Sequence, residues 1–178
     1  MIKTQDDVTA GQVILVDEED REVGTMEKLD AHRRGLLHRA VSAFLFDAEG
    51  RHLLQRRADH KYHSAGLWSN ACCSHPCPGE SASDAVSRRL REEMGVTVPL
   101  TPVLRYTYRA ELENDLVEHE VDHVFVGRFD GIPAPNPAEV SEWRWITPDA
   151  LTAEMALAPA SFTAWFRLLL PEVQDLHR

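Results

Sequence analysis

The amino-acid sequence predicts an α/β fold in which a mixed sheet is sandwiched between helices in a single domain. Short apolar runs typical of strands stand before and after one long segment with helical spacing, and a second such segment lies further along the chain. This order lacks the regular strand–helix alternation of repeated βαβ units. The length of 178 residues suits one domain. We expect that domain to span residues 1–178, with about residues 1–10 flexible.

The first half of the chain contains two predicted hairpins. Residues 12–17 form an apolar run that ends at the charged turn EEDRE. Residues 40–47 and 52–57 are strand-like and flank a turn that contains Gly50. Residues 58–67 are expected to form a loop. The segment WSNACCSHP, residues 68–76, predicts one short strand that a proline ends.

The second half begins with the long helical segment. After Gly79, apolar residues recur at helical spacing until Gly95, which is a typical stop signal. Strands are predicted near residues 103–110 and 118–129, joined by a polar turn at residues 113–115, and again at EWRWI. A short helix should begin at Pro148, and residues 161–170 predict an amphipathic helix.

The charge and hydropathy of the chain exclude several classes of function. A net charge of −10 disfavours non-specific binding to nucleic acid or to an anionic membrane. No apolar run approaches the roughly 20 residues of a membrane helix, and the first residues lack the apolar region of a signal peptide. We therefore expect a cytosolic protein. An anionic substrate would need locally gathered basic residues and a divalent metal.

Three cysteines stand close together at Cys72, Cys73 and Cys77. An odd, tightly spaced set is a poor disulfide framework, so metal binding or catalysis is the better interpretation. A structural zinc site made of these thiols and His75 is the alternative. It is weaker because adjacent cysteines project to opposite sides of a strand, and no second Cys or His pair stands at zinc-finger spacing.

Histidines and carboxylates supply a second set of metal-ligand types. On a strand, Glu118 and Glu120 would point to the same face, so both could reach one ion. Three imidazoles and two carboxylates suit an octahedral Mn²⁺, Mg²⁺ or Zn²⁺ centre. The complete candidate set is His32, His38, His75, Glu118 and Glu120. Taken singly, each has an ordinary surface or core explanation, which is the interpretation given to the remaining histidines, His63 among them.

The helical segment from Gly79 to Gly95 resembles the Nudix signature helix, whose carboxylates hold Mg²⁺ against a diphosphate. Arg89 and Glu93 are four residues apart and share one helix face. Nudix hydrolases carry Arg-Glu where this chain has Arg88 and Arg89, so a key metal ligand of the hydrolytic centre is missing. The resemblance therefore predicts the fold without the hydrolysis. A surface helix with salt-bridged charges is the ordinary alternative.

Several further motifs extend the resemblance to nearly the whole chain. The strings EKLDAH, LLHRAVSAFLF, RRADHK, GLWSNACCSHPCPGES, RRLREEMGV, YRA and VEHEV resemble the type I isopentenyl-diphosphate isomerases in order and spacing, over roughly residues 12–170. The resemblance implies a Nudix-like fold and a metal-dependent interconversion of isopentenyl and dimethylallyl diphosphate in isoprenoid biosynthesis. It implies no organic cofactor, a small diphosphate as the partner, and a chain that we expect to be monomeric.

The resemblance also assigns roles to residues. It implies that Cys73 and Glu120 are catalytic, with Tyr108 beside Glu120. It implies that the five candidate donors hold Mn²⁺, Zn²⁺ or Mg²⁺. Glu93 and the Cys73 backbone would hold a second Mg²⁺ on the diphosphate. Phosphate-binding positions match Lys28, Arg57, Lys61 and Arg89, and an aromatic residue near the hydrocarbon matches Trp165, for which core packing is the alternative explanation.

The chemistry fits these assignments. Moving the double bond requires a proton to add at C4 and another to leave C2, which two groups on opposite faces of the substrate can accomplish. Which of Cys73 and Glu120 donates stays open. The sequence departs from the family in a His32–His38 spacing one residue shorter than in enterobacterial relatives and in Ser74, where glycine is common. A Nudix hydrolase and a non-enzymatic metal- or partner-binding module are the rival hypotheses.

Overall fold

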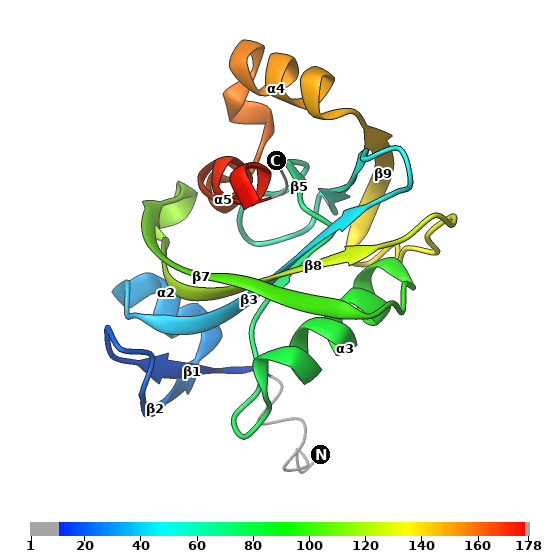
Figure 1. Ribbon diagram of the computed structural model, residues 1–178. Helices are drawn as coiled ribbons and strands as arrows, with labels where there is room; N and C mark the ends of the chain where they lie inside the picture. Colours follow the sequence, from blue (N-terminus) through cyan, green and yellow to red (C-terminus); the bar gives the residue numbers. More distant parts are fainter. Residues whose placement is uncertain (1–10, 177–178) are drawn as a thin grey trace.

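The computed structural model describes residues 11–176, so the expected flexibility of residues 1–10 lies outside the described part of the chain. A mixed sheet runs through the middle of the molecule, with helices on both of its faces (Figure 1). The strands are β1 (Gln12–Val16), β2 (Glu22–Glu27), β3 (His38–Phe46), β4 (His52–Arg57), β5 (Trp68–Ser69), β6 (Cys72–Ser74), β7 (Leu100–Glu111), β8 (Val117–Arg128) and β9 (Val140–Ile146). The helices are α2 (Lys28–Arg34), α3 (Ala82–Met94), α4 (Pro148–Leu157) and α5 (Ala164–Leu176), with 3₁₀ turns η1 (Glu113–Asp115) and η2 (Pro159–Ser161).

Strand β3 is the centre of the sheet. It pairs in parallel with β8 over its whole length, while β8 pairs antiparallel with β7. Strands β1 and β4 also pair with β3. Strand β2 pairs with β1, whereas β5 and β9 pair with β4. This mixture of parallel and antiparallel pairs is the predicted mixed sheet.

The second predicted hairpin is correct only at its turn. The turn after Asp47 joins β3 to β4, but the two strands pair only at Phe46 and His52. Beyond that point β3 follows β8 and β4 follows β9. Seven of the nine residues of β3 are buried, as is typical of a parallel strand that is covered on both faces. A local pattern cannot reveal a partner strand that lies so far along the chain.

The single strand predicted for residues 68–76 is wrong, because two short strands take its place. Strand β5 pairs with β4, whereas β6 pairs with β3. Between them, the Asn70 side-chain amide donates to the carbonyl oxygens of Ala43 at 3.1 Å and Cys72 at 2.6 Å. These hydrogen bonds satisfy backbone groups where the chain crosses from one strand partner to the other.

Two cores lie on the two faces of the sheet. Helix α3 packs Leu90 and Met94 against Val41 and Leu45 of β3 on one face. Helix α5 lies over the other face, where its residues pack with side chains such as Phe44. Neighbouring β3 residues thus alternate between the cores, as the two-residue period of a strand requires. Helix α5 begins at Ala164 and continues past Pro171, so its predicted limits of 161–170 were too early at both ends.

The predicted stop of the long helix is confirmed. Ser81 caps α3 by accepting from the Asp84 backbone N–H, and Gly95 ends it in the left-handed conformation with φ of 65°. A Cβ at this position would come within 2.5 Å of the Ala134 carbonyl oxygen.

Gly95→Ala is therefore expected to destabilise the fold by about 2 kcal/mol or more, because left-handed strain of about 1–2 kcal/mol adds to a backbone clash. Gly50→Ala is the matched control, since Gly50 also has positive φ but nothing lies within 4 Å of its added Cβ. Urea unfolding of both variants measures the difference. Equal losses of stability would show that the clash at Ala134 is relieved at no cost.

Candidate active site

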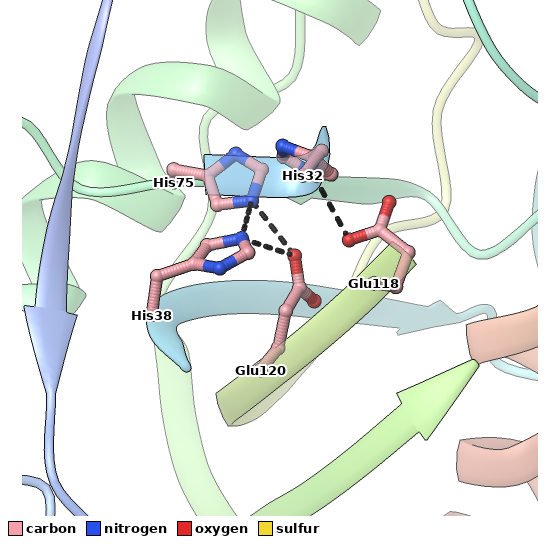
Figure 2. Close-up of side chains that lie close together, drawn as sticks. All are labelled: His32, His38, His75, Glu118 and Glu120. Atoms are coloured by element: carbon pink, nitrogen blue, oxygen red, sulfur yellow. Dashed lines mark hydrogen bonds and ion pairs between the residues drawn. The ribbon is translucent and has the colours of Figure 1, made fainter. Parts of the chain in front are cut away.

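Five metal-ligand side chains converge between α2, the start of β3, the end of β6 and one face of β8 (Figure 2). One donor atom from each lies within 4.8 Å of the others. The set is the one that the sequence predicted, namely His32, His38, His75, Glu118 and Glu120. All are buried except His75, which is partly exposed.

Strand register explains why these side chains meet. His38 is the direct neighbour of Glu120 in the parallel β3–β8 pair. Glu118 is two residues before Glu120 and shares its face of β8. His32 comes from α2, which Gly35 ends in the left-handed conformation, so that the chain turns at once into β3. The short His32–His38 spacing is thus accommodated by the end of the helix.

The donor set fits a divalent cation. The Nδ1 atoms of His32 and His38 lie 2.6 Å and 2.8 Å from the carbonyl oxygens of Lys28 and Leu36, so each Nδ1–H donates to the backbone. In the neutral form of each ring, Nε2 then has a lone pair directed toward the cluster, as in ligating histidines. The Nε2 atoms of His38 and His75 are only 3.2 Å apart beside Glu120, an arrangement that a shared cation stabilises.

Burial and neighbouring charges set the protonation of these groups. Burial lowers the pKa of His75 well below its usual value, which keeps the imidazole neutral as a metal ligand requires. Burial opposes charge on His32 as well, but the hydrogen bond to Glu118, the charge of that carboxylate and the hydrogen bond to the Lys28 carbonyl together raise its pKa. For Glu120, burial favours the neutral acid, yet the hydrogen bond from His38 and that from Tyr108 lower its pKa.

The candidate catalytic groups lie beside the donor cluster. A carboxylate oxygen of Glu120 lies within 4.8 Å of the Cys73 sulfur and of an Asp122 carboxyl oxygen. The Tyr108 hydroxyl donates to Glu120 Oε2 at 2.5 Å, because the two residues face each other across the β7–β8 pair. Ser42 in turn donates to Asp122 Oδ2 at 2.7 Å. Cys73, Tyr108 and Glu120 are thus brought together as predicted.

The Cys73 thiol is held in its protonated form. Burial, followed by the negative charges of Glu120 and Asp122, raises the pKa of Cys73 well above its usual value. Cys77 is half-buried, and burial raises its pKa to a lesser extent.

Iodoacetamide should therefore alkylate Cys73 more slowly than Cys77 at pH 8, because the thiolate is the nucleophile and a raised pKa lowers its population. The rate at Cys73 should keep rising with pH, without a plateau below pH 9. Tandem mass spectrometry of the peptide that contains both thiols measures the two rates. A plateau at Cys73 near neutral pH would contradict this protonation state.

The four predicted phosphate-binding residues also gather near the cluster. Burial lowers the pKa of Lys28, and the other three cations lower it further; they are Arg57, Lys61 and Arg89. Arg89 pairs with Glu93 at 2.9 Å, and Glu139 links Lys61 to Arg89. The Nε–H groups of Arg57 and Arg89 are buried without a hydrogen-bond partner among residues 11–176. A concentrated positive charge with free donors is thus present on an acidic protein.

The two remaining predicted residues lie at the margins of the donor cluster. Glu93 is buried on α3 and accepts from Gln55 and Arg89, both within 2.9 Å, so it stands outside the five-donor group. Trp165 is the second residue of α5 and is buried in the core, where its Nε1–H donates to Ser69 Oγ at 2.9 Å. The Arg57 guanidinium lies 5.2 Å from the centre of the Trp165 ring. Trp165 therefore packs in the core and also lies near the candidate site.

The structural zinc alternative does not fit the thiols. Cys72 packs in the core beside α3, whereas Cys73 packs against the core beside α5. The two sulfurs thus lie on opposite faces of the sheet, and all three cysteines are free thiols.

Some site residues escaped the sequence analysis. His63, for which the sequence predicts an ordinary surface or core position, is 4% exposed, and its Nε2 lies 3.5 Å from Glu118 Oε1. Asp122 continues the two-residue spacing of Glu118 and Glu120, a signal that could have identified it. Nothing local marks Glu139 as the link between Lys61 and Arg89. A groove of about 820 Å³ lies elsewhere, between the β3–β4 turn and α4, and contains none of the predicted site residues.

The fold and the site define a NUDIX-class domain with a candidate divalent-metal centre. A family model described as the NUDIX domain matches residues 36–166. The crystal structure of DR0079 from Deinococcus radiodurans has a TM-score of 0.70 at 27% identity, covering 82% of this chain and 89% of that one. A MutT protein from Methanosarcina mazei, at 22% identity and a TM-score of 0.63 over 80% of this chain and 96% of that one, shares the fold. The predicted Nudix-like α/β fold is confirmed.

Other relatives are far more similar in sequence. An isopentenyl-diphosphate Delta-isomerase of Burkholderia multivorans is 57% identical over 94% of this chain and 96% of its own length. Proteins of the same name from Pectobacterium atrosepticum and Nocardia farcinica are 49% and 48% identical over 92% of this chain, and over 92% and 94% of their own lengths. This chain belongs to the isopentenyl-diphosphate Delta-isomerase family, as its motifs predicted. Among residues 11–176, no helix is long and apolar enough to cross a membrane.

Proposed function

We propose that this protein interconverts isopentenyl diphosphate and dimethylallyl diphosphate, and that Cys73 and Glu120 transfer the protons. The observation that carries the proposal is the position of the Cys73 thiol within 4.8 Å of a Glu120 carboxylate oxygen, beside a five-donor cluster. A Nudix hydrolase needs no such thiol. The chain also has Arg89 where the hydrolases carry a metal-binding glutamate.

The diphosphate is bound by the basic residues around the cluster. Arg57 and Arg89 offer buried Nε–H donors, which suit phosphate oxygens because charge-assisted hydrogen bonds are strong. Lys28 and Lys61 add positive charge within the same region. A Mg²⁺ ion that accompanies the diphosphate would be held by Glu93 and the Cys73 backbone. Glu93 would have to exchange its contact with Arg89 for this role.

The proton transfers are divided between the thiol and the carboxylate. In the forward direction one group delivers a proton to C4 while the other removes one from C2, and in the reverse direction their roles exchange. Cys73 starts with its proton and Glu120 starts without one. An alkene between them needs about 3.5 Å on each side. Since their atoms lie within 4.8 Å, one of the two side chains turns aside when the substrate enters.

The protein also has to stabilise and protect the developing cation. Tyr108 holds the Glu120 carboxylate by its hydrogen bond, and the Trp165 ring offers an electron-rich face that already attracts Arg57. The loop 58–67 excludes water beside the cluster, since its Ser64 is buried and its backbone is bonded to β4.

The metal and the setting complete the proposal. Mn²⁺, Zn²⁺ or Mg²⁺ at the five donors would fix the Glu120 carboxylate and offset its charge, which is the contribution of the bound ion. The three free thiols support a reducing, cytosolic compartment. We propose that the chain acts there as a monomer, which sedimentation analysis would test.

The experiment is incubation of the purified protein with isopentenyl diphosphate and Mg²⁺ in D₂O, with Mn²⁺ in parallel, followed by NMR. Dimethylallyl diphosphate that carries deuterium is the expected product. Release of phosphate with the double bond unmoved would instead support a hydrolase. No conversion by folded, metal-loaded protein would exclude both activities for this substrate.

A further inference from the structure

His63 lies at the back of the donor cluster, in the loop between β4 and β5. Its ring stacks on His32, with centroids 5.7 Å apart and planes inclined by 28°. It also makes a T-shaped contact with Trp165, with centroids 5.9 Å apart. At 4% exposure the imidazole is almost completely removed from water. It therefore touches one of the metal donors and the proposed substrate wall at the same time.

The two oxygens of Glu118 face different histidines. Oε2 lies 3.1 Å from His32 Nε2, on the side of the cluster. Oε1 lies 3.5 Å from His63 Nε2, on the outer side. A carboxylate that gives one oxygen to a metal commonly has its other oxygen held by a hydrogen-bond donor, which fixes its orientation. His63 stands where that donor is needed.

The tautomer of His63 with its hydrogen on Nε2 gives both ring nitrogens a partner. Its Nδ1 lies 3.3 Å from Ser64 Oγ, which can donate to it. Nε2 then carries the ring hydrogen and points it toward Glu118. A shift of a few tenths of an ångström brings the 3.5 Å separation into the range of a normal hydrogen bond.

The loop holds His63 firmly in this position. The Arg57 guanidinium donates to the His63 carbonyl oxygen at 3.3 Å. The next residue, Ser64, has a positive φ of 50° and its backbone N–H donates to the Glu113 carboxylate at the β7–β8 turn. A strained residue retained by a specific long-range contact indicates that the position of its neighbour matters.

We infer that His63 is a positioning residue of the metal centre, whose Nε2–H orients Glu118 and whose ring fixes that of His32. This inference rests on the proposed metal centre and is independent of which proton donor the isomerase uses. Loss of such a partner typically lowers metal affinity by about 10- to 100-fold.

Two substitutions of similar size separate hydrogen bonding from packing. His63→Gln keeps an N–H donor, whereas His63→Leu fills the same space without one. His60→Ala changes an exposed histidine of the same loop and is the control. Titration of each protein with Mn²⁺ alone, with free Mn²⁺ measured by electron paramagnetic resonance, gives the affinity. Circular dichroism and thermal unfolding in excess chelator check each fold without the ion.

The expected result is a 10- to 100-fold loss of Mn²⁺ affinity in His63→Leu, with most of it recovered in His63→Gln and none lost in His60→Ala. Wild-type affinity in His63→Leu would overturn the inference. Equal losses in the Leu and Gln variants would also overturn it, because the N–H would then contribute nothing. Failure of the unsubstituted protein to bind Mn²⁺ would refute the proposed metal centre itself, which is a different outcome from either.

Discussion

Cys73→Ala is expected to lower kcat for isomerisation by about 10²- to 10⁴-fold, the range that a positioned acid–base group contributes. The alanine removes the thiol that lies within 4.8 Å of the Glu120 carboxylate, while the metal donors and the basic residues stay in place. KM should change much less than kcat, because the proposed diphosphate contacts come from basic side chains, Glu93 and the Cys73 backbone, all of which the substitution keeps. Deuterium incorporation from D₂O, followed by NMR, measures the residual rate.

Cys77→Ala is the matched control for this substitution. Cys77 is a half-buried thiol close to Cys73 in sequence, but its sulfur lies 3.7 Å from the Arg88 guanidinium. Its loss should leave kcat within about twofold, as expected of a substitution away from the reacting groups. Near wild-type turnover by folded Cys73→Ala would remove the thiol from the mechanism.

Glu120→Gln should lower both kcat and metal affinity. The amide keeps the shape of the side chain and can still accept from Tyr108, but it brings no negative charge to the cation and cannot take up a proton. We expect kcat to fall by about 10²- to 10⁴-fold, and Mn²⁺ affinity to fall by at least the roughly 10-fold typical of losing a partner around a metal. Activity assays at saturating metal separate the two effects.

Glu111→Gln is the control, since the side chain of this exposed β7 residue forms a surface ion pair with Arg109 at 3.2 Å. It should alter neither quantity measurably. If Glu120→Gln regained full activity at high metal concentration, Glu120 would be a ligand without a role in proton transfer.

Local sequence signals predicted the elements whose causes are local. Helix α3 was found because its cap, its apolar spacing and its terminal Gly95 all lie within one short segment. The pairing of β3 was missed because β8, its main partner, is far along the chain, and strand periodicity does not identify a partner. The break at Asn70 was missed for the same reason, because its amide bonds depend on the position of Ala43.

The five residues of the donor cluster were predictable from the sequence, whereas the residues that surround them were not. Two-residue spacing put Glu118 and Glu120 on one face, and the family motifs supplied the three histidines. His63 could not be recognised because a histidine in a polar loop resembles any other. Only the fold of the loop over α2 brings its ring onto His32 and its nitrogen toward Glu118.

Metal uptake by this chain has to wait for long-range folding. His38 and Glu120 are neighbours in a parallel strand pair that joins segments about eighty residues apart, and such pairings form slowly because a long loop must first close. A nascent chain that ends before β8 contains the imidazoles but lacks the two carboxylates that complete the set. The ion is thus captured by the finished sheet, and at 100 times its dissociation constant it adds about 2.7 kcal/mol to the stability of that state.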